Sequence, residues 1–171
     1  MHMLLRTLWG FLTKPFLKAR VPGEVHKISM RVWPTDIDVL WHVNNGMYFS
    51  YMDFGRWDMI FRNGLYDRVI KQGMYTVVAG EMIRFKRSIG LWKKFDLVTE
   101  PLGHDEKYFF IRQKFFVAGE LMAVGLVKVR FVRRKGGSVP SSEVLRLFPE
   151  SLESQPITLG DRWFGLESEF F

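Results

Sequence analysis

The sequence predicts one α+β domain in which an antiparallel sheet of five or six strands wraps around a single long central helix. The segment 46–62 contains no proline and is apolar around most of its circumference, which is typical of a buried helix. A strand-like alternation precedes this helix, and four longer strand-like segments follow it. The 171 residues and 47% apolar content suffice for one ordinary core and argue against two full-sized domains.

The first strand is expected within residues 24–33. Ile28, Met30 and Val32 alternate there with polar residues, and His26 lies near the start of the strand. A proline directly after this segment ends the strand, because proline lacks the amide that a sheet ladder requires.

The central helix is expected to begin at an asparagine and to end at a glycine. Asn44 or Asn45 can serve as the N-cap, since a short carboxamide accepts hydrogen bonds from the unpaired amides of the first turn. Asn63-Gly64 is a suitable stop, because glycine readily adopts a positive φ. We expect the exposed strip of the helix to carry Asp58 and Arg62, which are four residues apart in the favourable acid-then-base order.

Four further strands complete the predicted sheet, and short glycine-bearing or polar turns separate most of them. Their expected ranges are 75–86, 93–101, 107–118 and 121–133. The order of one strand, one long helix and four antiparallel strands is the basis of the predicted fold class.

The ends of the chain differ in composition from the predicted domain, which we place at 21–135. Residues 134–138 are basic and glycine-rich, which predicts a flexible segment at the end of the domain. It leads into a C-terminal extension, 136–171, in which we expect a short helix at 140–147. Residues 1–20 form an amphipathic, basic N-terminal segment.

Two interpretations of the N-terminal segment stay open. Its apolar residues could dip into a membrane surface while its cations face anionic lipid, or the segment could dock on the domain itself or on a partner subunit. It is too short and too charged to span a bilayer. The formal net charge of +7 suggests an anionic partner, which could be nucleotide phosphates, an acidic carrier protein, a membrane or nucleic acid.

The polar residues with the greatest potential for chemistry lie between the first strand and the helix, in the sequence DIDVLWHVNNGMY at 36–48. This stretch holds Asp36, Asp38, His42 and the two asparagines against an otherwise apolar background. The chain has no cysteine, which excludes disulfides, thiolate zinc sites and thiol nucleophiles. It also lacks the motifs of serine hydrolases and P-loop NTPases.

Over residues 24–133 the chain resembles the hotdog-fold thioesterases of the 4-hydroxybenzoyl-CoA and acyl-ACP type. The segment WPTDIDVLWHVNN resembles, more narrowly, the branch named for thioesterase superfamily member six. The resemblance implies hydrolysis of acyl-CoA or acyl-ACP, no cofactor and no metal, and a homodimer or dimer of dimers with sites at the interface. We expect a cytoplasmic protein that contacts membranes, if at all, peripherally through residues 1–20.

The resemblance assigns the catalytic carboxylate to Asp38, which could act as general base on water or attack the thioester carbonyl itself. His42 would orient the water or polarise the carbonyl, although a loop-shaping role is an alternative. Amides near Asn45 and Gly46 would hold the developing oxyanion, aided by the helix dipole. Asn44 is expected to act as a capping and turn residue beside the substrate. The resemblance also adds Tyr48 to the substrate-binding residues, and we read Asp36 as structural.

Two positions depart from the family pattern. Plant acyl-ACP thioesterases carry a functional asparagine where this chain has Leu40. Many relatives have glycine directly before the histidine, where this chain has Trp41. A non-catalytic, membrane-associated module that binds acyl lipids therefore stays an alternative to the enzyme.

Basic residues that cluster at the predicted strand ends are candidates for binding the phosphates of coenzyme A or an acidic carrier, with an ordinary solvated surface as the alternative. They are Lys86, Arg87, Arg133, Arg134 and Lys135. A dehydratase is a further alternative within the fold, but its motifs differ. The aromatic and basic run 108–116 could suggest nucleic-acid binding, but it lacks an RNA-recognition signature and fits a core strand better. We expect no nucleic-acid partner.

Overall fold

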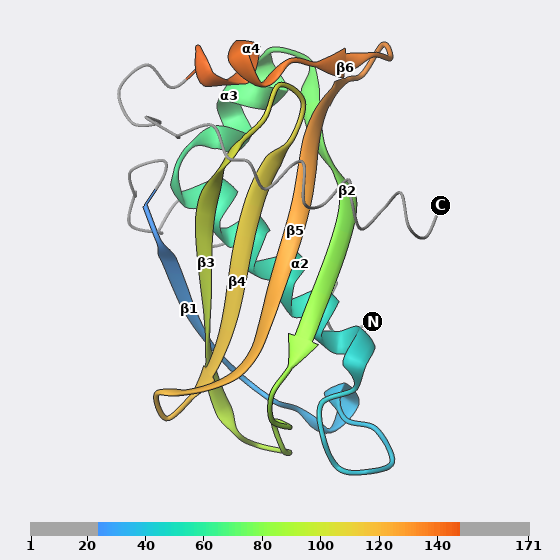
Figure 1. Cartoon of the computed structure of the whole chain (residues 1–171), viewed down its shortest axis with the longest axis vertical. Coiled ribbons are helices and arrows are strands. Elements are labelled where there is room, and N and C mark those ends of the chain that lie inside the picture. Colours follow the sequence, from blue (N-terminus) through green and yellow to red (C-terminus); the bar gives the residue numbers. More distant parts are fainter. Residues whose placement is uncertain (1–23, 148–171) are drawn as a thin grey trace.

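A computed structural model describes residues 24–147 (Figure 1). The predicted N-terminal segment 1–20 and the end of the C-terminal extension lie outside the described residues. The helices are α2 (Asn45–Arg62), α3 (Leu65–Lys71) and α4 (Ser141–Leu145), and a short 3-10 turn, η2, covers Pro34–Asp36. The strands are β1 (His26–Arg31), β2 (Met74–Phe85), β3 (Lys94–His104), β4 (Phe109–Val117), β5 (Glu120–Arg133) and β6 (Ser138–Val139).

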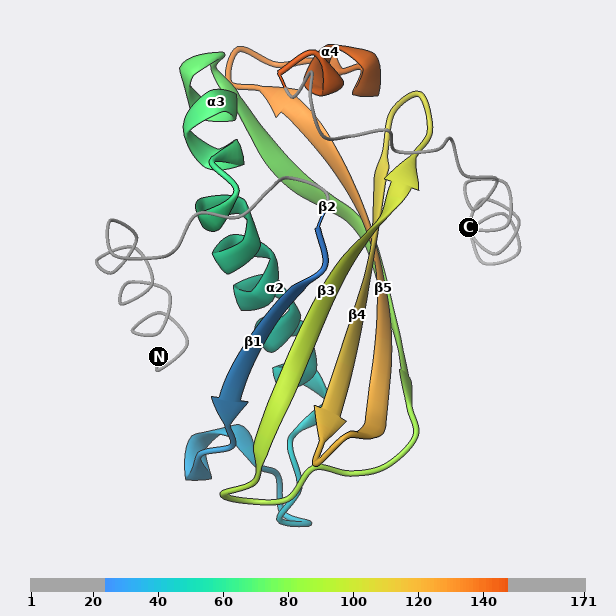
Figure 2. The ribbon, with the colours of Figure 1, turned by 90° about the vertical axis from the view of Figure 1, so that its left-hand side faces the viewer.

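The strands form one antiparallel sheet in the order β1-β3-β4-β5-β2, and β6 pairs with β5. Helix α2 lies along one face of this sheet, which curves around it (Figures 1 and 2). The predicted fold class is confirmed. The turn predicted at 118–120 joins β4 to β5 through Ala118 and Gly119, both of which have positive φ, as a tight hairpin requires.

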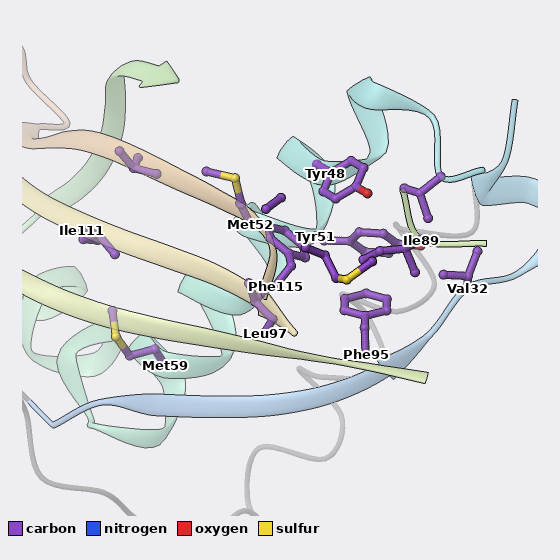
Figure 3. Close-up of a cluster of buried hydrophobic side chains, with 14 of the residues drawn as sticks. Val32, Tyr48, Tyr51, Met52, Met59, Ile89, Phe95, Leu97, Ile111 and Phe115 are labelled. Atoms are coloured by element: carbon purple, nitrogen blue, oxygen red, sulfur yellow. The ribbon is translucent and has the colours of Figure 1, made fainter. Parts of the chain in front are cut away.

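The main core lies between α2 and the sheet. Tyr48 stacks edge-on against Phe115 with ring centroids 5.0 Å apart, and Tyr51 packs against Phe95 at 4.9 Å (Figure 3). The aromatic run 108–116 that could have suggested nucleic acid is strand β4, which places Phe110 and Phe115 inside the fold. Core packing is therefore the correct explanation of that run.

Helix α2 approaches the sheet most closely at Gly55. A Cβ atom there would lie 2.7 Å from Cδ2 of Leu97 and 3.1 Å from the side chains of Thr99 and Gln113. Only glycine fits this contact without displacing its neighbours. The close approach also brings polar groups of the helix within reach of polar groups on the strands.

A buried polar network occupies this interface, centred on Arg56. The guanidinium donates to Oε1 of Gln113 at 3.0 Å and pairs with Glu81 of β2 at 2.7 Å. Gln113 in turn donates to the carbonyl of Met52 and to Oγ1 of Thr99. Burial raises the pKa of Glu81, and Arg56 offsets only part of that effect. No local pattern in the sequence indicates this network.

The expected exposed strip of α2 is wrong, although its two residues do pair. Nε of Arg62 donates to Oδ2 of Asp58 at 2.8 Å, and the same oxygen lies 2.5 Å from Nε2 of His26. His26 is 2% exposed, because β1 crosses this part of the helix. The helix therefore uses the acid and base to hold a buried histidine rather than to face solvent.

The predicted helix stop is confirmed by Gly64, which has φ of 71°. The chain then continues into α3, which was not predicted. The expected flexible segment at 134–138 is a turn instead, with the amide of Arg133 donating to the carbonyl of Gly137 at 3.0 Å. Strand β6 and α4 follow it and pack on the end of the sheet. A second apolar cluster forms there, and it consists of Val69, Met74, Phe131, Val139 and Val144.

Candidate active site

The predicted site residues lie on a small hairpin that leads from β1 into α2. The carbonyl of Asp36 accepts from the amide of Asn44, and the amide of Asp38 donates to the carbonyl of His42, both at 2.9 Å. Ile37 and Val43 form the bridge pair between these two hydrogen bonds. Asp38 and His42 therefore stand opposite each other near the tip of the hairpin.

The tip is a turn over residues 38–41 whose last residue, Trp41, is left-handed. The amide of Trp41 donates to the carbonyl of Asp38 at 3.1 Å, and Trp41 has φ of 61°. A three-residue hairpin loop of this kind closes with a residue in the left-handed region, where glycine is favoured. This geometry explains why glycine suits the position before the histidine, and in this chain a tryptophan occupies it.

Asp38 is half-buried, and Oδ1 of its carboxylate accepts from the amide of Leu40 at 2.9 Å. That hydrogen bond fixes one oxygen and orients the carboxylate. His42 is exposed, and its ring makes no hydrogen bond to any other residue between 24 and 147. The backbone pairing thus holds Asp38 opposite His42, and both side chains remain accessible to a substrate.

Asp36 has the structural role that was expected. It is fully buried, and Oδ2 accepts from the amide of Trp33 at 2.8 Å, which holds the turn η2 together. The two aspartates of the D-x-D sequence therefore differ in role, because the first closes a buried turn and the second reaches the hairpin tip.

Asn44 is the N-cap of α2, as predicted. Its Oδ1 accepts from the amide of Gly46 at 2.9 Å, and its carbonyl accepts from the amide of Met47. Asn45 is the first helical residue and is exposed. The amide of Gly46, a predicted oxyanion donor, is thus engaged by the cap, and it becomes available to a thioester oxygen only when the Asn44 side chain turns away.

Tyr48 lies beneath the hairpin rather than at its surface. Its ring is enclosed by Phe85 and Phe115, each with its centroid 5.0 Å away. Burial raises the pKa of Tyr48, and a hydrogen bond with the backbone of Ile89 offsets only part of the rise. Tyr48 therefore supports the floor of the site, and its predicted contact with substrate stays a prediction.

The loop between β2 and β3 forms a second wall of the site. The amide of Val43 donates to the carbonyl of Ile89 at 2.9 Å, and His42 bridges to Gly90. Lys86 and Arg87 begin this loop and are exposed, and the guanidinium of Arg87 pairs with Glu120. These two predicted phosphate-binding residues are therefore at the same end of the sheet as the hairpin.

The expected clustering of Arg133 with Lys86 and Arg87 is wrong within one chain. In the β2–β5 ladder Arg133 pairs with Met74 at the start of β2, whereas Lys86 follows the end of that strand. Antiparallel pairing thus separates them by roughly 35 Å, the length of a 12-residue strand. Arg133 binds Glu143 of α4 instead, through two contacts of 2.8 Å.

The described part of the chain offers no group of three His, Cys, Asp or Glu side chains placed to hold a metal ion, and none of its helices is long and apolar enough to cross a bilayer.

Comparisons with known proteins agree with this fold and motif. A protein named THEM6 from Xenopus laevis is 35% identical over 130 residues, which cover 68% of this chain and 63% of that protein. Proteins of the same name from Danio rerio and Drosophila melanogaster also match, over 52% and 60% of their lengths, so the chain spans little more than half the length of these relatives.

Solved structures of thioesterases share the hotdog fold. A probable thioesterase from Escherichia coli superposes with a TM-score of 0.66 at 18% identity, covering 72% of this chain and 98% of that one. A DHNA-CoA thioesterase from Staphylococcus aureus gives 0.64 at 17% identity, covering 84% and 91%. The family model described as "Thioesterase-like superfamily" matches residues 32–155. The predicted resemblance is confirmed, and the chain belongs to the thioesterase-like superfamily.

Proposed function

We propose that the chain hydrolyses an acyl thioester to a free acid and a thiol, with Asp38 as general base. The observation that carries the proposal is the position of Asp38 near the tip of the hairpin that leads into α2, opposite His42 in the backbone pairing. One carboxylate oxygen is held by the amide of Leu40, which leaves the other to take a proton from water.

The remaining steps need little from the protein, because a thiolate leaves readily. His42 is exposed beside Asp38 and can orient the attacking water. The N-terminus of α2 points its dipole toward the hairpin, which stabilises a developing oxyanion. In this scheme the amides of Asn45 and Gly46 become oxyanion donors once substrate displaces the Asn44 cap.

A second copy of the chain completes the proposed site. Strand β2 is an edge of the sheet and has twelve residues, with exposed apolar side chains that an unpaired edge does not tolerate well. These side chains are Tyr75, Val78, Met82 and Phe85. Antiparallel pairing of two β2 strands about their centres would cover them.

Such pairing would also bring Arg133 of the second copy to the Lys86 end of the first. The two residues would then be separated by two strand spacings, about 10 Å, a span that the phosphates of coenzyme A can bridge. This arrangement restores the cationic cluster predicted from the sequence, with residues from two chains. Acyl-CoA and acyl-ACP both carry phosphate and stay joint candidates for the substrate.

A thiol-release assay over a panel of acyl-CoA and acyl-ACP substrates tests the proposal. Asp38→Asn should lower the turnover rate by about 100-fold or more with the fold intact. Glu106→Gln is the matched control, since Glu106 is exposed and lies on the β3–β4 connection at the other end of the sheet. Equal rates for the native protein and Asp38→Asn would refute the role of Asp38.

A single turnover in ¹⁸O-labelled water separates the two roles open to Asp38. A general base directs the label into the released acid, whereas attack by the carboxylate gives a mixed anhydride whose hydrolysis can leave label in Asp38. Label in the protein would replace the base role with the nucleophile role.

The second candidate function is binding of acyl lipid without turnover. It is favoured by Leu40, which presents an apolar side chain to solvent where acyl-ACP thioesterases have a functional asparagine. Tight binding of a non-hydrolysable acyl-CoA thioether, with no thiol released from any thioester of the panel, would decide for this candidate.

A further inference from the structure

Exposed apolar side chains gather at the end of the domain that carries the hairpin. Val39 is 92% exposed, Leu40 and Trp41 are 69% and 68% exposed, and Trp33 and Trp92 are each 49% exposed. We call these five residues the tryptophan patch. It holds three of the six tryptophans of the chain. Soluble surfaces rarely expose so many large apolar side chains together without a partner.

Three loops build the tryptophan patch, and their backbones hold one another. Trp33 follows β1, residues 39–41 are the hairpin tip, and Trp92 precedes β3. The rings of Trp33 and Trp92 meet edge-on with centroids 5.6 Å apart, and the amide of Trp92 donates to the carbonyl of Val32. Figures 1 and 2 both place these loops at the same end of the molecule. The patch is thus a fixed, protruding surface.

Two of the tryptophans occupy unfavourable backbone positions. Trp41 has φ of 61° and Trp92 has φ of 63°, and between residues 24 and 147 Ala118 is the one other non-glycine residue with positive φ. The left-handed region costs about 1 kcal/mol or more for a residue with a side chain. Trp41 is mostly exposed and gains little packing in exchange, so folding stability does not account for its position, and strain of this kind points to function.

Cations surround the tryptophan patch. Lys86, Lys93 and Lys94 are exposed, and none of them forms an ion pair with another described residue. Arg31 donates to the carbonyl of Trp92 at 3.0 Å, which adds a further positive charge beside the rings. Of the nearby carboxylates, Asp36 is buried and Glu120 is paired with Arg87. Asp38, in the hairpin turn, is a remaining negative charge beside the patch, and the lysines outnumber it.

We propose that the tryptophan patch docks the domain on an anionic lipid bilayer. Tryptophan is enriched at the membrane–water interface because its ring is apolar and its N–H is polar, and lysines beside it are attracted to acidic headgroups. A second copy of the chain fits this surface less well, since self-association would bring the same unpaired lysines together. The exposed apolar residues of β2 form a separate group that a second copy already explains.

Docking in this orientation would bring the hairpin tip to the bilayer surface. Asp38 lies in the same turn as Leu40 and Trp41, so the proposed site would face the phase in which long acyl chains collect. The membrane proposal does not depend on hydrolysis, because binding to vesicles is measured without a substrate.

The experiment measures co-sedimentation of the full chain with phosphatidylcholine vesicles, with and without phosphatidylserine. Leu40→Ser combined with Trp41→Ser should weaken binding by about tenfold or more, since both side chains lose their place in the interface. Lys93→Glu combined with Lys94→Glu should remove the dependence on phosphatidylserine. Circular dichroism and thermal melting of each variant establish that the fold is retained.

Matched controls come from surfaces outside the patch. Val25→Ser removes an exposed apolar residue just before β1, at the end of that strand away from the patch. Lys71→Glu combined with Lys107→Glu makes the same charge change at the opposite end of the domain, at the end of α3 and on the β3–β4 connection. Both controls should bind vesicles as the native chain does. A loss equal to that of the patch variants would mean that binding follows overall charge or stability, and would overturn the proposal.

Two other outcomes would also overturn it. Undiminished binding by the Leu40 and Trp41 variant, together with lost binding after Leu5→Ser and Leu8→Ser, would assign membrane contact to the N-terminal segment. Dissociation of an oligomer by the patch variant in the absence of lipid, seen by analytical ultracentrifugation, would make the patch an interface between copies.

Discussion

Two aspartate–histidine pairs lie near opposite ends of helix α2, and they are built in opposite ways. Near its C-terminal end Asp58 lies 2.5 Å from buried His26 and also accepts from Arg62. Before its N-terminal end Asp38 and His42 oppose each other across a hairpin, where His42 is exposed and Asp38 accepts from a backbone amide.

The difference shows that the buried, hydrogen-bonded pair is the less suitable one for chemistry. The carboxylate oxygen of Asp58 that faces His26 is also held by Arg62, and His26 is 2% exposed. A group so enclosed cannot reach a substrate. The hairpin pair is held opposite through its backbone only, and its side chains are open to solvent, as a site that acts on an external molecule requires.

The largest expected effect is on stability at the buried pair. Asp58→Ala leaves His26 and Arg62 without their shared acceptor and should lower the free energy of unfolding by about 3 kcal/mol. Asp38→Ala removes one hydrogen bond from a surface turn and should cost about 1 kcal/mol or less. Urea unfolding of both variants measures the contrast, and equal losses would contradict the distinction between the two pairs.

The same comparison predicts a dependence on pH. Burial would raise the pKa of Asp58, but hydrogen bonds from His26 and Arg62 outweigh it and hold the pKa below its usual value. A carboxyl group whose pKa falls on folding stabilises the protein above its unfolded pKa of about 3.9, and the contribution disappears as the pH falls through the folded pKa. The stability difference between the native chain and Asp58→Asn should therefore be present at neutral pH and shrink below about pH 4. A difference that persists unchanged at low pH would mean that Asp58 acts by packing alone.

The second effect concerns the close approach of α2 to the sheet. Gly55→Ala would place its Cβ 2.7 Å from Leu97 and disturb the Gln113 network, so we expect a net loss of about 2 kcal/mol despite the better helix propensity of alanine. Gly90→Ala is the control in the hairpin region, because its Cβ would meet no atom closer than the carbonyl oxygen of Trp41 at 4.0 Å. Thermal unfolding should separate the two variants, and a stable Gly55→Ala would show that the interface can yield.

Much of the fold could be predicted because its signals are local. The apolar circumference of 46–62, the asparagine at its start and the glycine at its end each follow from backbone chemistry and were found in place. The alternation of the long strands was equally informative, since a strand buried on one face repeats every second residue. Identification of Asp38 depended on the motif and its family resemblance, not on periodicity.

Two of the errors share one cause, which is that partners distant in the sequence cannot be predicted from local patterns. Asp58 and Arg62 look like a surface pair until β1 places a histidine over them. Arg133 looks like a neighbour of Lys86 until the antiparallel register sends it to the other end of β2. The left-handed conformation of Trp41 is set by the turn. A glycine at this position would have indicated it, whereas a tryptophan does not.

The third effect separates capping from catalysis at the start of α2. Asn44→Ala removes the side chain that accepts from Gly46 and should cost about 1 kcal/mol of stability. If the Gly46 amide serves as an oxyanion donor, its release from the cap should leave the rate of thiol release unchanged or raised. A rate that falls as far as that of Asp38→Asn would instead give the Asn44 side chain a direct role in the reaction.

The smallest effect is a gain in stability where the others are losses, and it concerns the exposed tryptophan at the hairpin tip. Trp41→Gly relieves the left-handed strain at φ of 61° and loses few contacts, because the side chain is mostly in solvent, so stability should rise by about 0.5–1 kcal/mol. The same change should weaken binding to anionic vesicles. A gain in stability together with a loss of lipid binding would mean that the chain keeps tryptophan at a glycine position for contact with a surface, at the expense of the fold. A loss of both would mean that Trp41 stabilises the hairpin, and would make the open pair more like the buried one than the structure indicates.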